Sequence, residues 1–311
     1  LKQVKKLINN GADINFRDKE KKLPCLLWCA YKGHLSIIKY ILEGPLEKKI
    51  KPKNVIYSIP YYATISDGRK WICYDKIVKY IYSKYSSKIK QKDKNIQLIN
   101  ATRLCSSKNC FKVIKFLVEH GANVNSENNY GQTPLVCSVW RCLKVVKYLV
   151  SKGANVNYKK EHITVLFSAA WGGSLKIVKF LVSKGADVNI RNYIGHTALM
   201  NASVQGHFDI VKYLVSKGAD VNIAYKFGST ILAYAVDSGN LELVKFLVRH
   251  GANVNAVAGI ENQSGAYFRS ILDDAIHRAN PKYYKKDYKK YIPIIRYLRS
   301  KGAKTYKELY R

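Results

Sequence analysis

The feature that most constrains this chain is a nine-residue string that recurs five times at nearly constant spacing. The form Leu-Val-Ser-Lys-Gly-Ala-Asp-Val-Asn occupies 181–189 and 214–222, and close variants occupy 117–125, 149–157 and 247–255. The glycines of the five strings are separated by 32, 32, 33 and 33 residues. Such a period indicates one supersecondary unit repeated along an axis, with each unit burying its apolar face against its neighbour.

Weaker copies of the string extend the repeat toward both ends of the chain. A full copy lies at 7–15, a shortened one at 40–45, and a copy at 77–85 has Tyr85 where glycine is expected. A further copy at 297–304 closes the series. The sequence therefore predicts about nine units, several of them degenerate.

Each unit is predicted to contain two helices and a turn. In the unit that ends at Gly218, Thr197 is placed to cap a first helix, and the pair Gly206 and His207 interrupts it. A second helix follows from an apolar stripe at i, i+1, i+4 and i+5, formed by Ile210, Val211, Leu214 and Val215. Gly218 then falls where a left-handed helix end requires a residue without a Cβ atom.

Several short motifs resemble those of the ankyrin-repeat family. They are Gly-Gln-Thr-Pro-Leu at 131–135, Gly-His-Thr-Ala-Leu at 195–199, the Gly-His pairs at 33–34 and 206–207, and the Gly-Ala-Asp-Val-Asn strings. The composition of the repeats, rich in Lys, Tyr, Ile and Asn, resembles that of the ankyrin proteins encoded by giant DNA viruses. The resemblance implies an all-α solenoid of paired antiparallel helices joined by hairpin turns.

The expected organisation has four segments. We expect N-terminal units over 1–45, the first incomplete, a degenerate Lys/Tyr-rich part over 46–98 and a regular array over 99–258. A capping unit is expected over 259–311, because Gly251 and Gly302 are 51 residues apart, an excess of 18 over the repeat. A terminal unit that departs from the repeat is what a solenoid end requires.

Several classes of function are disfavoured by the sequence. Lys or Arg interrupts every apolar stretch before it reaches membrane-spanning length, and we expect no signal peptide, since no apolar segment follows the charged residues 2–6. The seven cysteines include no Cys-x-x-Cys pair, and Cys29, Cys105 and Cys137 fall in a small-residue slot where helices approach, so we expect buried thiols. No nucleotide, protease or hydrolase motif occurs. We therefore expect no catalysis, metal or cofactor, and an intracellular protein, cytoplasmic in the first place, with the nucleus left open.

The resemblance implies a protein partner bound on the concave side of the solenoid, and the likeness to viral proteins suggests a host protein. That side consists of hairpin tips and the ends of the first helices. The residues expected there are Tyr31, Lys32, Tyr130, Gln132, Trp140, Trp171, Tyr193, His196, Lys226 and Phe227. Trp140 and Trp171 are expected on consecutive units, within reach of one ligand; the alternative is that they pack between units. No membrane or small-molecule partner is expected.

The net charge of +33 leaves a second function open. One position of the second helix is basic in each unit, at Lys5, Lys39, Lys79, Lys115, Lys147, Lys179, Lys212, Lys245 and Arg296. These bases and the Lys/Tyr-rich segment 282–290 could bind a polyanion such as nucleic acid. The alternative is an ordinary solvated helix face. A further alternative is the substrate-recognition part of a ubiquitin-ligase adaptor, as in some viral ankyrin proteins.

Two asparagines match a modification pattern. Leucine followed after five residues by Asp-Val-Asn resembles the substrates of the asparaginyl hydroxylase of the hypoxia pathway, and Asn189 and Asn222 match it fully. Asn125, Asn157 and Asn255 follow Asn instead of Asp at the second position before them, so they match less well.

Overall fold

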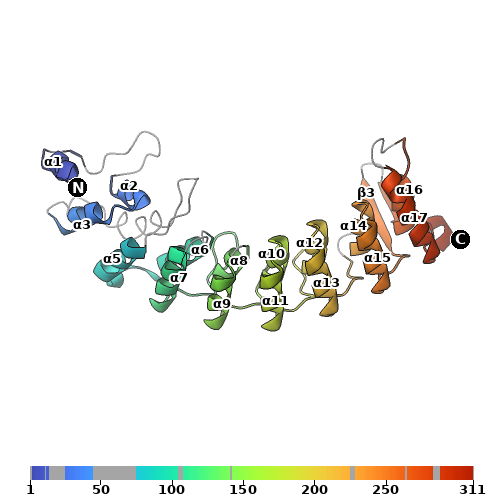
Figure 1. The fold of residues 1–311 in the computed structure, drawn as a ribbon, viewed down its shortest axis with the longest axis horizontal. Coiled ribbons are helices and arrows are strands. Elements are labelled where there is room, and N and C mark those ends of the chain that lie inside the picture. Colours follow the sequence, from blue (N-terminus) through green and yellow to red (C-terminus); the bar gives the residue numbers. More distant parts are fainter. Residues whose placement is uncertain are drawn as a thin grey trace. The chain divides into compact units, whose positions relative to one another are not determined.

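A computed structural model of the chain forms two compact parts, Leu1–Asn155 and Val156–Arg311, here called the N-terminal and C-terminal halves (Figure 1). The structure describes residues 2–10, 12–13, 25–44, 75–103, 108–140, 142–224, 228–262, 265–282 and 288–310. Much of the degenerate part expected over 46–98, together with Lys226, Phe227 and most of the segment 282–290, lies outside these residues.

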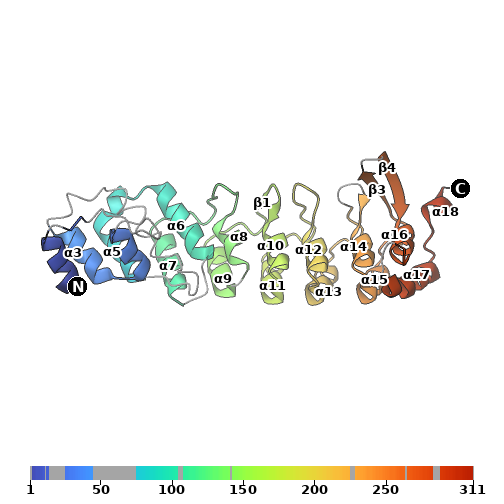
Figure 2. The ribbon, with the colours of Figure 1, turned by 90° about the horizontal axis from the view of Figure 1, so that it is seen from above.

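The C-terminal half is a row of four helix pairs (Figures 1 and 2). The pairs are α10 (Val165–Trp171) with α11 (Leu175–Ser183), α12 (Ala198–Val204) with α13 (Phe208–Ser216), α14 (Ile231–Asp237) with α15 (Leu241–Arg249), and α16 (Ile271–Arg278) with α17 (Tyr291–Ser300). The first helices pack on one another in the order α10, α12, α14, α16, while α11 packs on α13 and α15 on α17. We call the first helices inner and the second helices outer.

The N-terminal half uses the same two-helix unit. Its helices are α1 (Lys2–Asn9), α2 (Cys25–Lys32), α3 (Leu35–Glu43), α5 (Asp75–Tyr85), α6 (Gln91–Arg103), α7 (Lys108–Glu119), α8 (Pro134–Ser138) and α9 (Leu143–Ser151), with the 3₁₀ turn η3 (Ser86–Lys88) after α5. Helix α6 contacts α8, and α7 contacts both α5 and α9. The described helices therefore also form an inner and an outer layer.

Local sequence signals explain where the helices begin and end. The Thr197 hydroxyl accepts a hydrogen bond from the Met200 amide at 3.3 Å and caps α12, while Thr133 and Thr164 cap α8 and α10 in the same way. Helix α13 buries its apolar stripe at Ile210, Val211 and Leu214. Gly218 follows the helix with φ of +83°, in the left-handed region that glycine enters without steric cost. The predicted cap, stripe and glycine end are confirmed.

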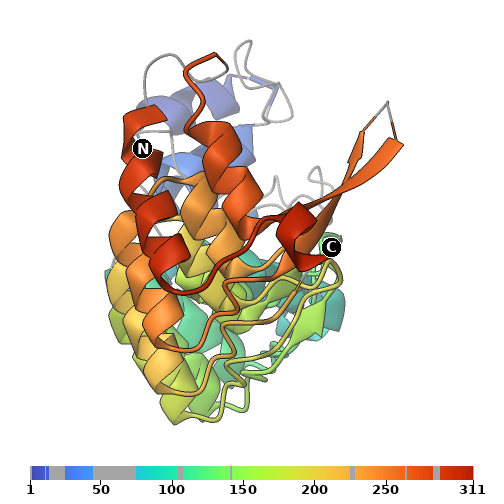
Figure 3. The ribbon, with the colours of Figure 1, turned by 90° about the vertical axis from the view of Figure 1, so that its right-hand side faces the viewer.

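Two antiparallel hairpins interrupt the helical pattern. Strands β1 (Lys159–Lys160) and β2 (Ile163–Thr164) are very short, whereas β3 (Val257–Asn262) and β4 (Gly265–Ser270) are six residues each and pair Val257 with Ser270. The longer hairpin projects away from the helix layers (orange in Figure 3). Part of the length added between Gly251 and Gly302 therefore forms a β-arm, and the fold is mostly helical with a little sheet. The chain ends with η5 (Tyr288–Lys290), α17 and α18 (Tyr306–Leu309).

One asparagine in each of the five strings fastens its unit to the next. The Asn189 amide donates to the Gly218 carbonyl at 3.1 Å, and its oxygen accepts from the Asp220 amide at 2.8 Å. Asn222 makes the same two bonds, to Gly251 and from Asn253. Asn125, Asn157 and Asn255 continue the series, which we call the asparagine ladder, within their halves of the chain.

The cysteines follow the expectation in part. Cys29 is a buried thiol, and burial raises the pKa of the Cys137 thiol to about 12, which keeps it protonated and unreactive near neutral pH. Cys110, however, is fully buried and disulfide-bonded, so the expectation that the cysteines are all thiols is wrong at this position. A sequence pattern of helices cannot show which sulfur atoms the packing brings together.

Among the described helices, none combines the length and the apolar character needed to cross a membrane.

We predict that Asn222→Ala lowers the free energy of unfolding by about 1–3 kcal/mol, because it leaves a carbonyl and an amide of the next unit without their partner. Asn253→Ala is the matched control: its side chain accepts a local bond from the Asn255 amide, so its loss should cost less. Urea unfolding of both variants measures the difference. Equal destabilisation would contradict the role of the ladder.

Candidate functional site

The hairpin tip at 190–197 is fixed to the preceding tip by a buried amide. Asn192 is 4% exposed, and its amide donates to the His162 carbonyl at 3.0 Å, while its oxygen accepts from the His196 amide at 2.9 Å. The backbone amide of Tyr193 also donates to the Glu161 carbonyl, at 2.6 Å. Because these bonds join two successive tips, the tips form one connected surface with little backbone freedom.

Tyr193 is the most exposed aromatic residue of this surface. Its side chain is 80% exposed, and its ring meets the His162 imidazole edge to face with the centroids 6.3 Å apart. Below it, burial and the neighbouring His162 lower the pKa of His196 from its usual value, so this imidazole is uncharged near neutral pH. The tip thus presents an amphipathic ring together with the uncharged His196 and the exposed cation of Arg191.

Trp171 lies at the last residue of α10 and is 45% exposed. Its ring lies 6.4 Å from the Phe167 ring, measured between centroids, and its carbonyl lies 3.3 Å from Nε2 of His207. His207 also fills the space beside Gly173, where an added Cβ atom would lie 2.5 Å from the imidazole. The end of α10 is therefore held against the start of α13, and half of the Trp171 ring faces solvent.

Val204 adds an apolar side chain at the corresponding end of α12. It is 54% exposed, and α12 packs directly on α10. Val204 occupies the same position of its unit as Trp171, but nothing in the sequence singled it out as a binding residue. We call the exposed residues of the hairpin tips and inner helices the inner surface.

The N-terminal half has a similar pair of exposed aromatic residues. Tyr130 is 77% exposed on a turn where its backbone amide donates to the Asn128 side chain, and Gln132 accepts from the amide of that same asparagine. Trp140 is 47% exposed just after α8. Each half therefore presents one tryptophan and one tyrosine at corresponding places of its inner surface.

The remaining predicted residues are less informative. Lys32 is exposed at the end of α2, whereas the side chain of Tyr31 and both Lys226 and Phe227 lie outside the described residues. Trp140 belongs to the N-terminal half and Trp171 to the C-terminal half. Their expected proximity stays a prediction.

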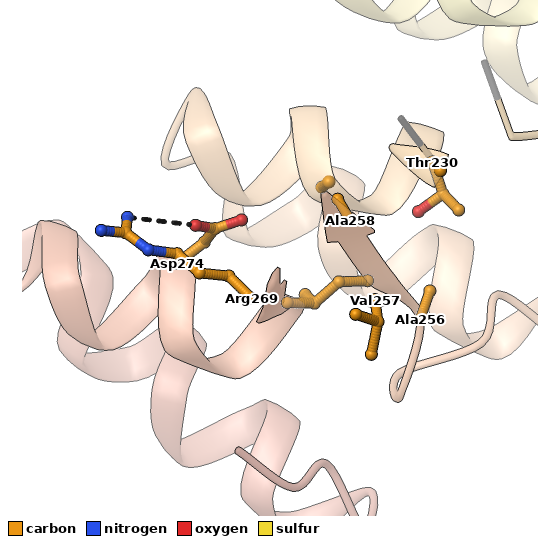
Figure 4. Close-up of a pocket in the computed structure, with 9 residues that line it drawn as sticks. Thr230, Ala256, Val257, Ala258, Arg269 and Asp274 are labelled. Carbon is orange, nitrogen blue, oxygen red and sulfur yellow. Dashed lines mark ion pairs between the residues drawn. The ribbon is translucent and has the colours of Figure 1, made fainter. Parts of the chain in front are cut away.

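A narrow hollow lies beside the β-arm (Figure 4). Thr230, Ala256, Val257, Ala258, Arg269 and Asp274 line it, and Arg269 pairs with Asp274 at 3.6 Å. Burial raises the pKa of Asp274, while Arg269 opposes that change. The hollow has no room for a water-sized group, so it does not suggest a substrate site. Within the described ranges, no group of three His, Cys, Asp or Glu residues could hold a metal ion.

A family model described as ankyrin repeats (3 copies) matches residues 70–160 and 166–258, which together are more than half of the chain. The chain belongs to the ankyrin-repeat family. A search of curated proteins gave no significant match. Ankyrin repeats generally mediate binding between proteins, and ankyrin-repeat proteins are typically non-enzymatic scaffolds. In this ankyrin-repeat protein, the hairpin tips and inner helices that the repeat produces are also where Tyr193, Trp171 and Val204 are exposed.

We predict that Gly173→Ala is more destabilising than Gly185→Ala. Both glycines have positive φ, +70° and +84°, so both variants carry a similar backbone strain. At Gly173 the new methyl group also meets His207, whereas nothing lies within 4 Å of the corresponding position at Gly185. Thermal unfolding of the two variants, and of Gly173→Ala combined with His207→Ala, separates the clash from the strain. If His207→Ala does not restore any of the lost thermal stability, the clash with His207 is not the cause of the destabilisation.

We also predict that Asn189 and Asn222 are substrates of the hypoxia-pathway asparaginyl hydroxylase. Both side chains lie in the asparagine ladder, with Asn222 exposed and Asn189 half-buried. Incubation with the enzyme followed by peptide mass analysis should show one added oxygen on the peptides that contain them. The peptide with Asn192 and Asn201, neither of which fits the pattern, is the control. Unmodified Asn189 and Asn222 would contradict the prediction.

Proposed function

We propose that this ankyrin-repeat protein is a non-enzymatic scaffold that binds a protein partner through its inner surface. The observation that carries the proposal is the exposure of large aromatic residues there, Tyr193 and Trp171 in one half and Tyr130 and Trp140 in the other. A few residues supply most of the binding free energy at protein interfaces, and tyrosine and tryptophan are enriched among them. Exposed rings of this size are unfavourable in water unless a partner covers them.

The arrangement in the C-terminal half supports the proposal further. Helix α10 is seven residues long, or about 10 Å, so Tyr193 near its start and Trp171 at its end would span the width of a peptide or helix. Val204 extends the apolar part onto α12. The three side chains come from two adjacent units, which allows one partner to contact both.

The inner surface is also held rigid before any partner binds. The asparagine ladder fixes each hairpin on the next, Asn192 joins two tips, and His207 contacts the carbonyl at the end of α10. A surface that loses little conformational freedom on binding retains more of its contact energy as affinity.

The partner that we propose is a host protein met in the cytoplasm. This rests on the Lys-, Tyr-, Ile- and Asn-rich composition, which resembles that of the ankyrin proteins of giant DNA viruses. Exposed Lys159, Lys160 and Arg191 near the tips of the C-terminal half favour a partner with acidic side chains around an apolar anchor.

We predict that the double variant Trp171→Ala and Tyr193→Ala loses partner binding while it keeps its stability. Truncation of interface hot spots costs about 2–4 kcal/mol each, or a thirtyfold to a thousandfold loss of affinity. Proteins captured from host-cell lysate by the wild type should be absent from captures by this variant. Isothermal titration with the purified captured protein then measures the loss, and the same measurement on Trp140→Ala tests the N-terminal half.

The matched control replaces aromatic residues on the outer helices, Phe180→Ala and Tyr213→Ala, and should keep the captured protein. A captured protein that binds both double variants equally would place the interface elsewhere. If the variant Trp171→Ala with Tyr193→Ala loses binding because its melting temperature falls, then Trp171 packs within the fold and does not bind the partner.

A further inference from the structure

The positive charge of the helices in the C-terminal half is concentrated on the outer layer. The outer helices with their terminal glycines, 175–185, 208–218, 241–251 and 291–302, carry ten Lys or Arg residues and two acidic residues, Asp209 and Glu242. The four inner helices carry one basic residue, Arg278, and three acidic ones, Asp237, Asp273 and Asp274. Arg278 is paired with Asp237, so the inner layer has no excess positive charge.

The outer charges are arranged in register along the row of helices. We call Lys179, Lys212, Lys245 and Arg296 the outer basic ladder, because they occupy the same position of α11, α13, α15 and α17. A second row, Lys184, Lys217 and Lys301, directly precedes the terminal glycine of three of these helices. Apart from the half-buried Lys245, all of these side chains are exposed.

Aromatic rings on the same face hold these cations in place. The Lys179 ammonium lies 5.6 Å from the centre of the Tyr213 ring in the next unit, and Lys217 lies 5.9 Å from the same ring. Lys212 lies 4.5 Å from the Phe208 ring, and Lys301 lies 5.9 Å from the Tyr297 ring. Because ammonium groups occupy these rings, the rings order the cations and are poorly placed to stack on nucleobases.

Within the part of the chain that the structure describes, few acidic side chains pair with these cations. Lys245 pairs with Glu242 at 3.0 Å and Arg299 pairs with Glu308, but both pairs are at the surface and are weak. A lysine-rich coding bias would enrich both helix layers, yet the exposed positions of the inner helices carry no lysine. The division of charge therefore points to a polyanion on the outer layer.

We propose that the outer layer of the C-terminal half binds the phosphate backbone of double-stranded nucleic acid without reading its sequence. Stacked helices lie about 8–10 Å apart, so the four positions of the ladder span roughly 30 Å, along which a duplex presents a phosphate about every 1.7 Å. With 43 Lys against 11 Arg, the chain is poor in the bidentate group that reads base edges. The outer layer is distinct from the inner surface, so this binding is independent of the protein partner.

The test is fluorescence anisotropy of the full chain with labelled 30-base-pair duplexes of two unrelated sequences, from about 50 to 200 mM salt. We expect equal affinity for both duplexes and a slope of log K against log salt of about −2.7 to −3.6, since each of three or four neutralised phosphates contributes about −0.9. The triple variant Lys179→Gln, Lys212→Gln and Arg296→Gln should reduce the magnitude of this slope by about 3. It should also weaken binding at least tenfold at the lowest salt. The charge-conserving variant Lys179→Arg with Lys212→Arg, in which Arg296 is unchanged, should keep the affinity and the salt slope of the wild type.

The matched control removes the same charge elsewhere, by Lys159→Gln, Lys160→Gln and Lys304→Gln, and should keep most of the affinity and slope. No duplex binding at about 50 mM salt would overturn the proposal, and so would an equal loss in both triple variants. Polyglutamate of equal charge should displace the duplex less effectively than polyphosphate. If it displaces the duplex equally well, the surface binds acidic protein instead. Melting temperatures of the variants show that each remains folded.

Discussion

The asparagine side chain at the end of each string holds the units of this protein in register. In Asn189, Asn222 and Asn255, the amide donates to the carbonyl of the next terminal glycine, and the oxygen accepts from an amide just beyond it. Both bonds go to backbone atoms, so they fix the position of the next unit whatever its side chains are. The surrounding sequence can therefore change from unit to unit while the stacking is kept.

The constancy of this connection explains how the last unit accepts its additional residues. Asn255 reaches Gly302 and Lys304 across the β-arm, α16 and the segment before α17, and it makes the same two bonds as its counterparts. The unit is completed locally by Ser270, whose hydroxyl and backbone amide bond with Asp273 at the start of α16. The backbone amide of Tyr306 donates to that same carboxylate, so α18 is fastened to the start of α16. Part of the added length forms the β-arm, which projects from the helix layers and leaves them undisturbed (Figure 3).

A repeated helix pair produces two surfaces of different chemistry. The inner helices are short and mostly buried, and the exposed ends of α10 and α12 carry the uncharged side chains Trp171 and Val204. The outer helices bury one stripe and expose the opposite side, where lysine and aromatic residues alternate along the row and contact one another between units. Cation–π contacts such as that of Lys179 with Tyr213 stabilise neighbouring units and at the same time order the charges. These lysines can therefore stabilise the stacked units and also expose their positive charge to a ligand.

The sequence by itself determined the unit and its local geometry: the period, the Thr197 cap, the apolar stripe of α13 and the glycine end at Gly218. These features depend on interactions within a few residues, and the repeat shows them several times. Tertiary structure decided the contacts between units, about 30 residues apart, such as Asn192 with His162 and His207 with the end of α10. It also decided that Trp171 is half exposed, where the sequence left packing between units as the alternative, and that Cys110 forms a disulfide. A periodic pattern assigns equivalent positions, but the exposure of each side chain depends on which neighbours the stacked units bring against it.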